Sequence, residues 1–302
     1  MKILVTGGLG IIGTALVPEL ERLGHEVWIC DMPHHHHQRY RRCDVREYRQ
    51  LRALFDAEDF ECVYHLAAEF GRHNGEDHYE NLWSTNVIGT KNLIRLQEEQ
   101  QFRMVFFSSS EVYGDFTGVM SEDVMATTAV RQLNDYAMSK WVGEMQVMNS
   151  EVTHGTQTVR IRLFNIYGPG EYYSPYRSAI CVFAYRALLG LPYTVYLEHH
   201  RTSLYISDAI TTLARIATNF VPGRVYNIAG CERHDMKNVS DRILALAGQS
   251  DALVEYVDGE PMTARDKKVD AGRAERELQH HPRVPLDEGL KETLRWMRST
   301  YC

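Results

Sequence analysis

The sequence is poor in cysteine and has no arrangement of cysteines that would build a disulfide framework or a zinc site. Its 302 residues include six cysteines, with no C-x-x-C pair and no zinc spacing to histidine. We therefore expect reduced, mostly buried thiols. The histidine run His34–His37 and the pairs His199-His200 and His280-His281 lack carboxylate or cysteine partners at ligand spacing, so we expect solvated loops there and no catalytic metal.

Long apolar runs and basic runs are missing as well. No segment approaches the roughly 20 apolar residues that span a bilayer, and the net charge of −7 comes without a basic stripe of the kind that nucleic-acid binders show. A glycine loop begins at Gly7, too early for a signal peptide. With only 9 prolines, 21 glycines and 44% hydrophobic residues, the chain is neither disordered nor fibrous. We expect a cytoplasmic protein with no membrane or nucleic-acid partner.

Short apolar runs alternate with helical patterns along the first half of the chain. Strands are predicted at Lys2–Thr6, Glu26–Cys30, Cys62–Leu66 and Met104–Ser108, with a long helical segment around 82–97. Strands separated by helices imply right-handed crossovers and a doubly wound parallel sheet with helices on both faces, an α/β fold.

The second half keeps this alternation less regularly. Further strands are expected at Thr158–Phe164, Val225–Ile228 and Val254–Tyr256, and helices near 207–219, near 239–247 and over a last segment that contains Leu286, Leu290, Leu294 and Met297. We predict a nucleotide-binding domain over residues 1–165 and a smaller, mainly substrate-binding region over 166–302. Because no linker separates them, some segments of the second region are expected to return to the core sheet.

The glycine loop Thr6–Gly13 lies between the first strand and the first helix. Its glycines allow a tight turn, let the backbone approach a pyrophosphate and let helix and strand pack closely, and the helix N-terminus offers free N–H groups to phosphate. Asp31 ends the next predicted strand, near the expected spacing of about 20 residues. A carboxylate there accepts hydrogen bonds from the ribose hydroxyls of adenosine and repels a 2′-phosphate. The sequence therefore favours NAD over NADP as cofactor.

Tyr136 and Lys140 form a Y-x-x-x-K pair in a helical segment. Residues four apart share a helix face, so both side chains can enter one site. A neighbouring ammonium and the positive nicotinamide ring would lower the pKa of the phenol, so that tyrosine could act as a base. The alternative is an exposed lysine beside a half-buried tyrosine. The glycine loop and a serine cluster at the end of a strand favour the functional interpretation.

These motifs together resemble the extended short-chain dehydrogenase/reductases that modify nucleotide sugars. The resemblance covers almost the whole chain: TGGLGIIG at Thr6–Gly13, CDV at Cys43–Val45, HLAAE at His65–Glu69, NVIGTKNL at Asn86–Leu93, SSSEVYGD at Ser108–Asp115, YAMSK at Tyr136–Lys140, RLFNIYGPG at Arg162–Gly170, RTSLYISD at Arg201–Asp208 and VDAGRAEREL at Val269–Leu278. It implies a Rossmann-type fold, an NAD-dependent enzyme and a nucleotide-diphosphate sugar as substrate.

The resemblance also implies roles for individual residues. The cofactor-binding set is Gly7, Gly10, Ile11, Ile12, Gly13, Asp31, Asp44, Val45, Leu66, Ala67, Ala68, Tyr136 and Lys140. The catalytic set is Ser109, Glu111, Tyr136 and Lys140, and the substrate-binding set is Ser110, Asn165, Arg201 and Arg265. Arg265 stands within one or two positions of a second family arginine, where Asp266-Lys267-Lys268 departs from the common pattern.

The segment Ser109-Ser110-Glu111 bears on the reaction. In this family, simple 4-epimerases usually carry small or neutral residues at the position of Glu111, whereas hexose 4,6-dehydratases and uronate decarboxylases carry glutamate. Once C4 of a sugar is a ketone, the C5 proton is acidified and a carboxylate can remove it. The chain is therefore expected to favour dehydration or decarboxylation, with 4-epimerisation as the alternative; Glu69 also fits dehydratases, whereas Phe70 departs from them.

Two further expectations concern assembly and a different class of function. The resemblance implies a homodimer joined through the helix that contains Tyr136–Lys140 and the helix around 82–97, with Trp141 and Met145 supplying apolar contacts. A non-catalytic NAD-binding regulator on the same fold is the remote alternative, because a fold does not by itself imply activity. The chain keeps serine, tyrosine and lysine, which a degenerate member would be expected to lose.

Overall fold

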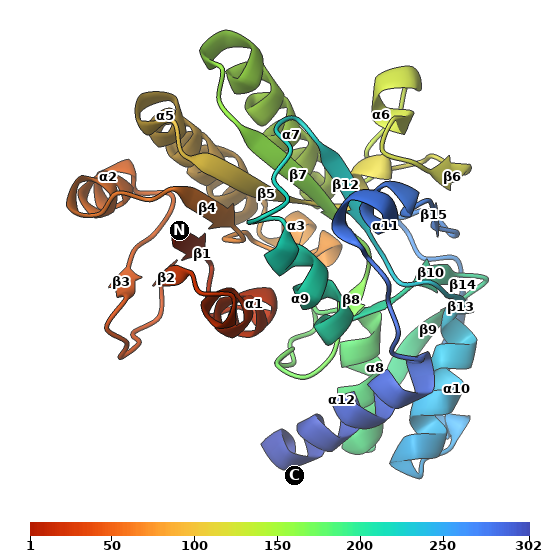
Figure 1. The fold of residues 1–302 in the computed structure, drawn as a ribbon. Coiled ribbons are helices and arrows are strands. Elements are labelled where there is room, and N and C mark those ends of the chain that lie inside the picture. Colours follow the sequence, from red (N-terminus) through yellow and green to blue (C-terminus); the bar gives the residue numbers. More distant parts are fainter.

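A computed structural model describes residues 1–302, and its centre is a seven-stranded parallel sheet (Figure 1). The strands follow the order β12 (Val225–Ile228), β7 (Thr158–Leu163), β5 (Arg103–Ser109), β4 (Cys62–His65), β1 (Lys2–Thr6), β2 (Glu26–Asp31) and β3 (Tyr40–Arg42). The order reverses at β1, since the chain first builds outward through β2 and β3 and then crosses to β4. In such sheets ligands bind at the carboxyl ends of the strands beside this reversal. The predicted parallel α/β fold is confirmed.

Helices cover both faces of the sheet and enclose two apolar cores. On one face lie α1 (Ile11–Arg22), α9 (Ile206–Arg215) and α11 (Gly272–Leu278), and on the other α2 (Tyr48–Ala57), α5 (Thr90–Gln100) and α7 (Asp135–His154). Successive side chains of a strand point to opposite faces. Val5 of β1 accordingly joins the first core and Leu4 the second.

The segment between β4 and α5 is helical but divided. It contains α3 (Arg72–Asp77), α4 (Tyr79–Trp83) and the π-helix η1 (Ser84–Gly89), which runs directly into α5. The predicted helix around 82–97 is confirmed. The short helix α3 was not anticipated by the sequence pattern, because its residues RHNGED show no apolar periodicity.

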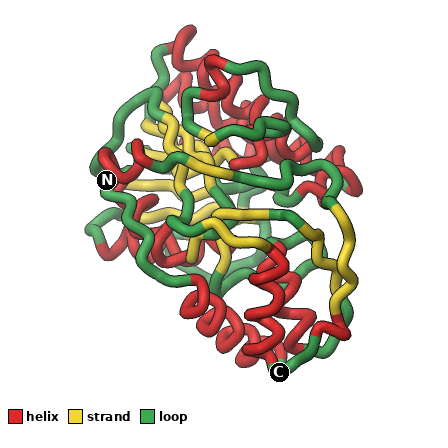
Figure 2. The backbone as a smooth tube through the Cα atoms, turned by 90° about the vertical axis from the view of Figure 1, so that its right-hand side faces the viewer, coloured by secondary structure: helices red, strands yellow, loops and turns green.

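A smaller region packs below the sheet and includes the C-terminus (Figure 2). It comprises α8 (Ala179–Leu188), β9 (Tyr193–Leu197), α10 (Met236–Ala247), β14 (Val254–Asp258) and α12 (Leu286–Tyr301) around an apolar core of its own. The predicted strand near 254 exists, but it pairs with β9 in a separate two-stranded sheet.

Short elements connect this region with the large sheet. They are η2 (Ser110–Tyr113), β6 (Val119–Met120), α6 (Val124–Thr127), β8 (Ile166–Tyr167), β10 (His200–Thr202), β11 (Leu204–Tyr205), β13 (Arg233–Asp235), η3 (Asp251–Leu253) and β15 (Lys268–Val269). β8 pairs with β11, β10 with β13 and β6 with β15. Since β12 lies in the large sheet and α9 packs against α1, the chain beyond residue 165 contributes to both parts. None of the helices has the combination of length and apolar character that a membrane span requires.

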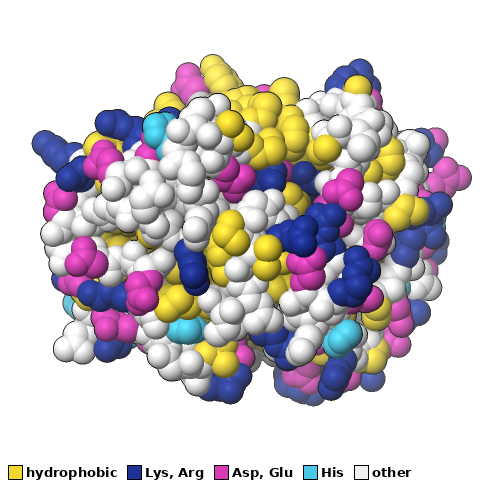
Figure 3. Space-filling model, turned by 45° about the horizontal axis from the view of Figure 1, so that its top comes forward, with side chains coloured by type: hydrophobic (Ala, Val, Ile, Leu, Met, Phe, Trp, Pro, Cys, Tyr) yellow, Lys and Arg dark blue, Asp and Glu magenta, His cyan; other side chains and the backbone are white.

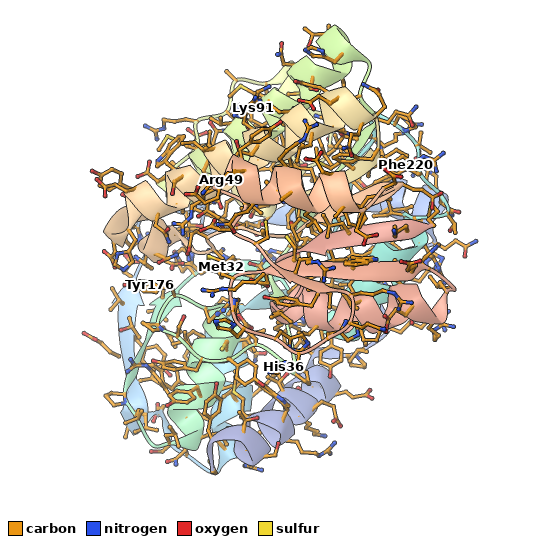
Figure 4. All side chains as sticks on the ribbon, turned by 90° about the vertical axis from the view of Figure 1, so that its left-hand side faces the viewer. Met32, His36, Arg49, Lys91, Tyr176 and Phe220 are labelled. Carbon is orange, nitrogen blue, oxygen red and sulfur yellow. The ribbon has the colours of Figure 1, made fainter.

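Two histidine pairs differ from the expectation of solvated loops. His199 and His280 are each only 1% exposed. His280 bonds to Thr212 Oγ1 at 2.8 Å and to the Ala229 carbonyl at 2.7 Å, so its imidazole is a structural link between segments. The run His34–His37 does lie on an exposed connection, between β2 and β3, where Figure 4 labels His36.

Candidate functional site

The glycine loop forms a tight turn between β1 and α1. Gly7 has φ +66°, and a Cβ there would lie 2.7 Å from the Ala67 nitrogen. A Cβ on Gly13 would lie 2.5 Å from the Cα of Gly8. The loop therefore accepts only glycine at both places, one because of backbone conformation and close approach, the other because the first turn of α1 packs directly on the loop.

The N-terminus of α1 is open toward ligands. Gly10 is the N-cap and has no side chain to cap the helix, so the N–H groups of Ile11, Ile12 and Gly13 keep their hydrogen-bonding capacity. Free N–H groups at the positive end of a helix dipole favour a phosphate. The arrangement fits the pyrophosphate of a dinucleotide.

Asp31 lies at the end of β2, beside this loop. Its two carboxylate oxygens accept hydrogen bonds from the backbone N–H of Leu9 at 2.9 Å and of Met32 at 2.8 Å. Each oxygen retains a further lone pair, so the oriented carboxylate can accept from ribose hydroxyls.

Asp44 and Val45 follow β3. The Arg46 guanidinium binds both oxygens of Asp44, the shortest contact being 2.6 Å, and this hydrogen bonding lowers the pKa of the Asp44 carboxyl. Val45 is buried, and its carbonyl accepts from Asn92 Nδ2 at 3.0 Å. Arg46 was not anticipated and leaves the Asp44 side chain with less free capacity for a ligand.

The loop after β4 contains Leu66, Ala67 and Ala68 and is tied to its neighbours on both sides. Its Ala67 N–H donates to Thr6 Oγ1 at 3.2 Å. Asn86 exchanges two hydrogen bonds with the backbone of Glu69, at 2.8 and 3.0 Å, and donates to Ser139 Oγ at 3.0 Å.

Asn86 thus joins the loop to α7, where the Tyr136–Lys140 pair lies. This linking role of Asn86 was not predicted from the sequence, although Asn86 is the first residue of the NVIGTKNL motif.

Tyr136 and Lys140 lie one turn apart on α7 and are both buried, at 6% and 5% exposure. The helix is fixed at its start by Asn134, whose side chain accepts the Ala137 N–H at 2.7 Å. Lys140 Nζ donates to the Phe107 carbonyl at 2.8 Å. The alternative of an exposed lysine beside a half-buried tyrosine is thus not what the structure has.

The charge state of Tyr136 differs from the simple expectation. Burial raises the pKa of Tyr136 above its ordinary value, a hydrogen bond with Ser109 opposes that rise, and the nearby Glu111 adds to it. Burial also lowers the pKa of Lys140 to about 8. Desolvation of the phenolate is the largest cause of the raised pKa of Tyr136, and the Lys140 ammonium is directed to the Phe107 carbonyl.

Glu111 stands two residues beyond Ser109, in the short helix η2 that Ser109 caps through its hydroxyl. Its carboxylate forms an ion pair with Lys267, which is 2% exposed. Burial opposes ionisation of Glu111, but the charges of Lys267, Arg72 and Arg201 prevail and lower its pKa to about 2. Burial lowers the pKa of Lys267 to about 8.

A second ion-pair group lies next to the first. The Glu260 carboxylate accepts from Arg72 Nη2 at 2.6 Å and lies 3.6 Å from Arg201 Nη2, and the Glu260 backbone N–H donates to His199 Nε2 at 2.8 Å. Arg201 is 8% exposed and also donates to the Arg265 carbonyl at 3.0 Å. Glu260 therefore joins Arg72, Arg201 and His199 in one group, and the charge of Arg201 contributes to the lowered pKa of Glu111.

The remaining predicted substrate-binding residues, Ser110, Asn165 and Arg265, differ in their surroundings. Ser110 is buried beside Glu111, and Asn165, with φ +39°, donates to the Thr202 carbonyl at 3.2 Å. Arg265 does not enter the group: its guanidinium is half exposed and pairs with Glu198 at 2.8 Å and Asp258 at 3.4 Å.

Lys267, two positions later, is the cation that reaches Glu111. Lys267, Glu260 and Arg72 were missed in the sequence. The only available signal was that 266–268 departs from the family pattern.

The fold and this site define a dinucleotide-binding enzyme with serine, tyrosine and lysine at the carboxyl edge of a parallel sheet. The model of the NAD dependent epimerase/dehydratase family matches residues 3–229. The chain belongs to this family, and NAD is its cofactor. The predicted family, enzymatic nature and cofactor are confirmed.

Individual relatives extend the likeness over nearly the full chain. A UDP-N-acetyl-alpha-D-glucosaminuronate decarboxylase of Bacillus cytotoxicus is 30% identical over 98% of each chain. A dTDP-glucose 4,6-dehydratase of Salmonella typhimurium is 26% identical over 98% of this chain and 92% of that protein. The solved structure of MoeE5 in complex with UDP-glucuronic acid and NAD has a TM-score of 0.87 at 27% identity, covering 99% of this chain and all of that one.

Proposed function

We propose that the enzyme oxidises C4 of a nucleotide-linked sugar and then, with Glu111, eliminates a group at C5–C6, by dehydration or decarboxylation. The observation that carries the proposal is an ionised carboxylate, Glu111, two residues from Ser109 and electrostatically coupled to Tyr136. A buried charge is costly unless it is paired, and here it is paired with Lys267. Relatives named as a decarboxylase and a dehydratase support this choice.

The glycine loop, the α1 N-terminus and Asp31 would hold NAD, with Ala67 and Lys140 at its nicotinamide end. When bound, NAD supplies the hydride acceptor. The fit rests on the tight glycine turn, in which Gly7 packs against the backbone of Ala67, and on the uncapped N–H groups of α1. We infer from the same arrangement that residues 1–165 hold the cofactor and that 166–302 mainly hold the sugar nucleotide, with Asn165 and Arg201 at its diphosphate.

Tyr136 takes the proton from the C4 hydroxyl in this mechanism, and Ser109 holds the same oxygen through a hydrogen bond. General-base assistance of this kind is worth roughly 10²–10⁴ in rate. The raised pKa of Tyr136 means that it becomes a base only once a positive charge stands beside it. Lys140, released from the Phe107 carbonyl, is the residue of this chain that can add to that charge.

Glu111 then acts on the C5 side of the 4-keto sugar. Its pKa of about 2 keeps it ionised at neutral pH, so it acts as an electrostatic neighbour, and as a base only where substrate weakens its ion pair with Lys267. Lys267 restrains its basicity and can return a proton, since burial brings the pKa of Lys267 to about 8.

A 4-epimerase is the second candidate. The Lys267 ion pair favours a 4-epimerase in one respect. A carboxylate that is held by a buried ammonium can position neighbouring groups without taking part in proton transfer. The two candidates differ in product mass: a lyase product lacks water or carbon dioxide, whereas an epimer keeps the mass of its substrate.

The test is Glu111→Gln, assayed on a panel of nucleotide sugars by product mass and by NADH absorbance. We expect C4 oxidation to survive, so that NADH accumulates while product formation falls. The matched control is Glu255→Gln, an exposed carboxylate on β14 that should leave both signals unchanged. If Glu111→Gln forms product at the wild-type level, the proposed dehydration or decarboxylation is wrong, and 4-epimerisation is then the better account of the reaction.

We also propose that two copies associate through α7 and the helices around η1. Met138, Met145 and Val152 recur every seven residues on α7 and are 38%, 42% and 87% exposed, and Figure 3 shows apolar side chains gathered on one part of the surface. Met145→Glu should shift sedimentation toward a monomer, and Val221→Glu, at a loop of similar exposure, should not. A wild-type monomer at micromolar concentration would exclude this assembly.

The cytoplasm is the proposed compartment. All six cysteines are free, and Cys231 and Cys302 are exposed, a state that a reducing compartment maintains. Fractionation of the native host with an antibody to the protein tests this, and recovery outside the cytoplasm would contradict it.

A further inference from the structure

His199 lies in the short connection between β9 and β10 and is held there by both its backbone and its ring. The side chain is 1% exposed. Its carbonyl accepts the Met236 N–H at 2.9 Å, and its Nε2 accepts the Glu260 N–H at 2.8 Å. Because moving the ring would break a buried hydrogen bond, the imidazole has a fixed position between Glu260 and Arg201.

The hydrogen-bonding neighbours of His199 cannot all be satisfied at once. Burial and the charge of Arg201 lower the pKa of His199 to about 4, so the ring is neutral at pH 7 and carries a single N–H. Since Nε2 accepts from the Glu260 backbone, this hydrogen lies on Nδ1. Nδ1 is 3.1 Å from Arg201 Nη2, a nitrogen that can only donate. The other tautomer would merely move the conflict between two donors to the Glu260 N–H.

Arg201 has one satisfied terminal nitrogen and one that lacks a good partner. Nη1 donates to the carbonyls of His200 at 2.9 Å and Arg265 at 3.0 Å. Nη2 reaches Thr263 Oγ1 only at 3.4 Å and the Glu260 carboxylate only at 3.6 Å. Both distances exceed the roughly 2.7–2.9 Å of a charge-assisted hydrogen bond to an anion. In a side chain that is 8% exposed, a charged N–H group of this kind normally has a partner, which a bound ligand can supply.

The Glu260 carboxylate is the group for which the two donors compete. Its Oε1 accepts from Arg72 Nη2 at 2.6 Å. Its Oε2 lies 3.6 Å from Arg201 Nη2 and 4.0 Å from His199 Nδ1, so a small movement would bring it to either of them. If Oε2 accepts from His199, then Arg201 Nη2 is available to another anion. If Oε2 accepts from Arg201, the guanidinium is occupied within the protein.

We propose that His199 is a positioning residue that donates its Nδ1 hydrogen to Glu260 and so leaves Arg201 Nη2 free for the diphosphate of the substrate. This inference rests on the proposed function, because it takes Arg201 as the residue at the diphosphate. When the diphosphate draws the guanidinium away from Glu260, His199 replaces it there. In the occupied site, neither His199 Nδ1 nor Arg201 Nη2 is then left without an acceptor.

The experiment is a double-mutant cycle of His199→Phe and Glu260→Gln on the NAD-loaded enzyme. The ligand is UDP or dTDP, whichever the wild type binds more tightly, and its Kd is measured by calorimetry. With Glu260 present, His199→Phe lets Arg201 close on the carboxylate, so the Kd should rise on the order of tenfold, the value of a charge-assisted hydrogen bond. With Glu260→Gln no carboxylate competes for Arg201, and His199→Phe should change the Kd by no more than about twofold.

The cycle separates positioning from support of the fold, because the N–H of residue 260 loses its acceptor in both backgrounds. An equal rise of the Kd in the two backgrounds therefore overturns the proposal. His199→Gln offers a carbonyl to that N–H and an N–H to the carboxylate, and should keep the Kd within about threefold of the wild type. A Kd for His199→Gln as high as that of His199→Phe also overturns the proposal.

His280→Phe is the matched control, since His280 is an equally buried histidine whose ring bonds to Thr212 and Ala229 instead. It should lower stability and leave the Kd unchanged.

Arg201→Met distinguishes failure of this inference from failure of the proposed function. A large rise of the Kd in Arg201→Met, together with equal effects of His199→Phe in the two backgrounds, keeps Arg201 at the diphosphate and rejects only the role of His199. An unchanged Kd in Arg201→Met rejects both assignments. The measurements follow binding alone, so they do not depend on whether the later reaction is an elimination or an epimerisation.

Discussion

Replacing Lys267 by methionine tests whether this ammonium sets the charge state of Glu111. In the native protein the pKa of Glu111 falls from its ordinary 4.5 to about 2, and the ion pair with Lys267 is a main cause. Methionine has a similar length and no charge. The pKa of Glu111 in Lys267→Met should therefore rise back toward 4.5, restrained by the remaining Arg72 and Arg201.

The magnitude follows from proton linkage. A carboxyl whose pKa is lowered in the folded state contributes stability that is present above its unfolded pKa and is lost as the pH falls through its folded pKa. For Glu111 this window runs from about pH 4.5 down to about pH 2, and the full contribution is about 3 kcal/mol. Between pH 7 and pH 3 the wild type should lose roughly 2 kcal/mol of it. Lys267 stays protonated in both states over this range and adds no slope.

The assay is urea unfolding at several pH values between 3 and 7, with Lys268→Met as the matched control. Lys268 is the next residue, is 53% exposed and pairs with Asp266 at 3.6 Å, so its loss leaves Glu111 unchanged. We expect Lys268→Met to keep the wild-type change in unfolding free energy between pH 7 and pH 3, and Lys267→Met to lose a large part of that change of about 2 kcal/mol. Identical slopes in the two variants would refute the assignment of Lys267 as the partner that ionises Glu111.

Three further predictions concern the cofactor and the base. Tyr136→Phe should reduce turnover by roughly 10²-fold or more, because the phenolate oxygen that accepts the C4 proton is gone; NAD titration should show binding weakened far less than turnover, and substantial residual turnover would show that another residue is the base. Asp31→Arg should weaken NAD binding and improve NADP binding, measured by fluorescence titration, and an unchanged ratio of the two affinities would contradict the ribose assignment. Gly7→Ala should lower stability and NAD affinity more than Gly24→Ala: both have positive φ, +66° and +85°, but a Cβ at Gly24 meets nothing within 4 Å, whereas one at Gly7 meets Ala67. Equal losses of unfolding free energy would show that backbone strain alone matters at Gly7.

Local patterns in the sequence predicted six of the seven strands of the large sheet and the position of each motif along it; the short edge strand β3 was missed. The strand at Lys2–Thr6 and that at Val225–Ile228 occur with the predicted bounds. A buried parallel strand is an uninterrupted apolar run, and glycine at a strand end marks the turn, so both signals are readable from neighbouring residues alone. Parallel strands also end at one edge of the sheet, which is why Asp31 and Ser109, far apart in sequence, could be predicted to share a site.

Only the tertiary structure decided which charges meet around Glu111. Lys267 lies 156 residues away from Glu111 and approaches it through β15, whose pairing with β6 has no periodic signal in two-residue strands. The neighbouring Arg265 carries the same sign of charge and turns outward to Glu198 and Asp258. Sequence spacing cannot distinguish two nearby cations in an irregular loop, because the direction of each side chain depends on the backbone of the folded chain. The pKa of Tyr136 likewise depends on burial and on whether a positive ring stands beside it, which are properties of the assembled site rather than of the Y-x-x-x-K spacing.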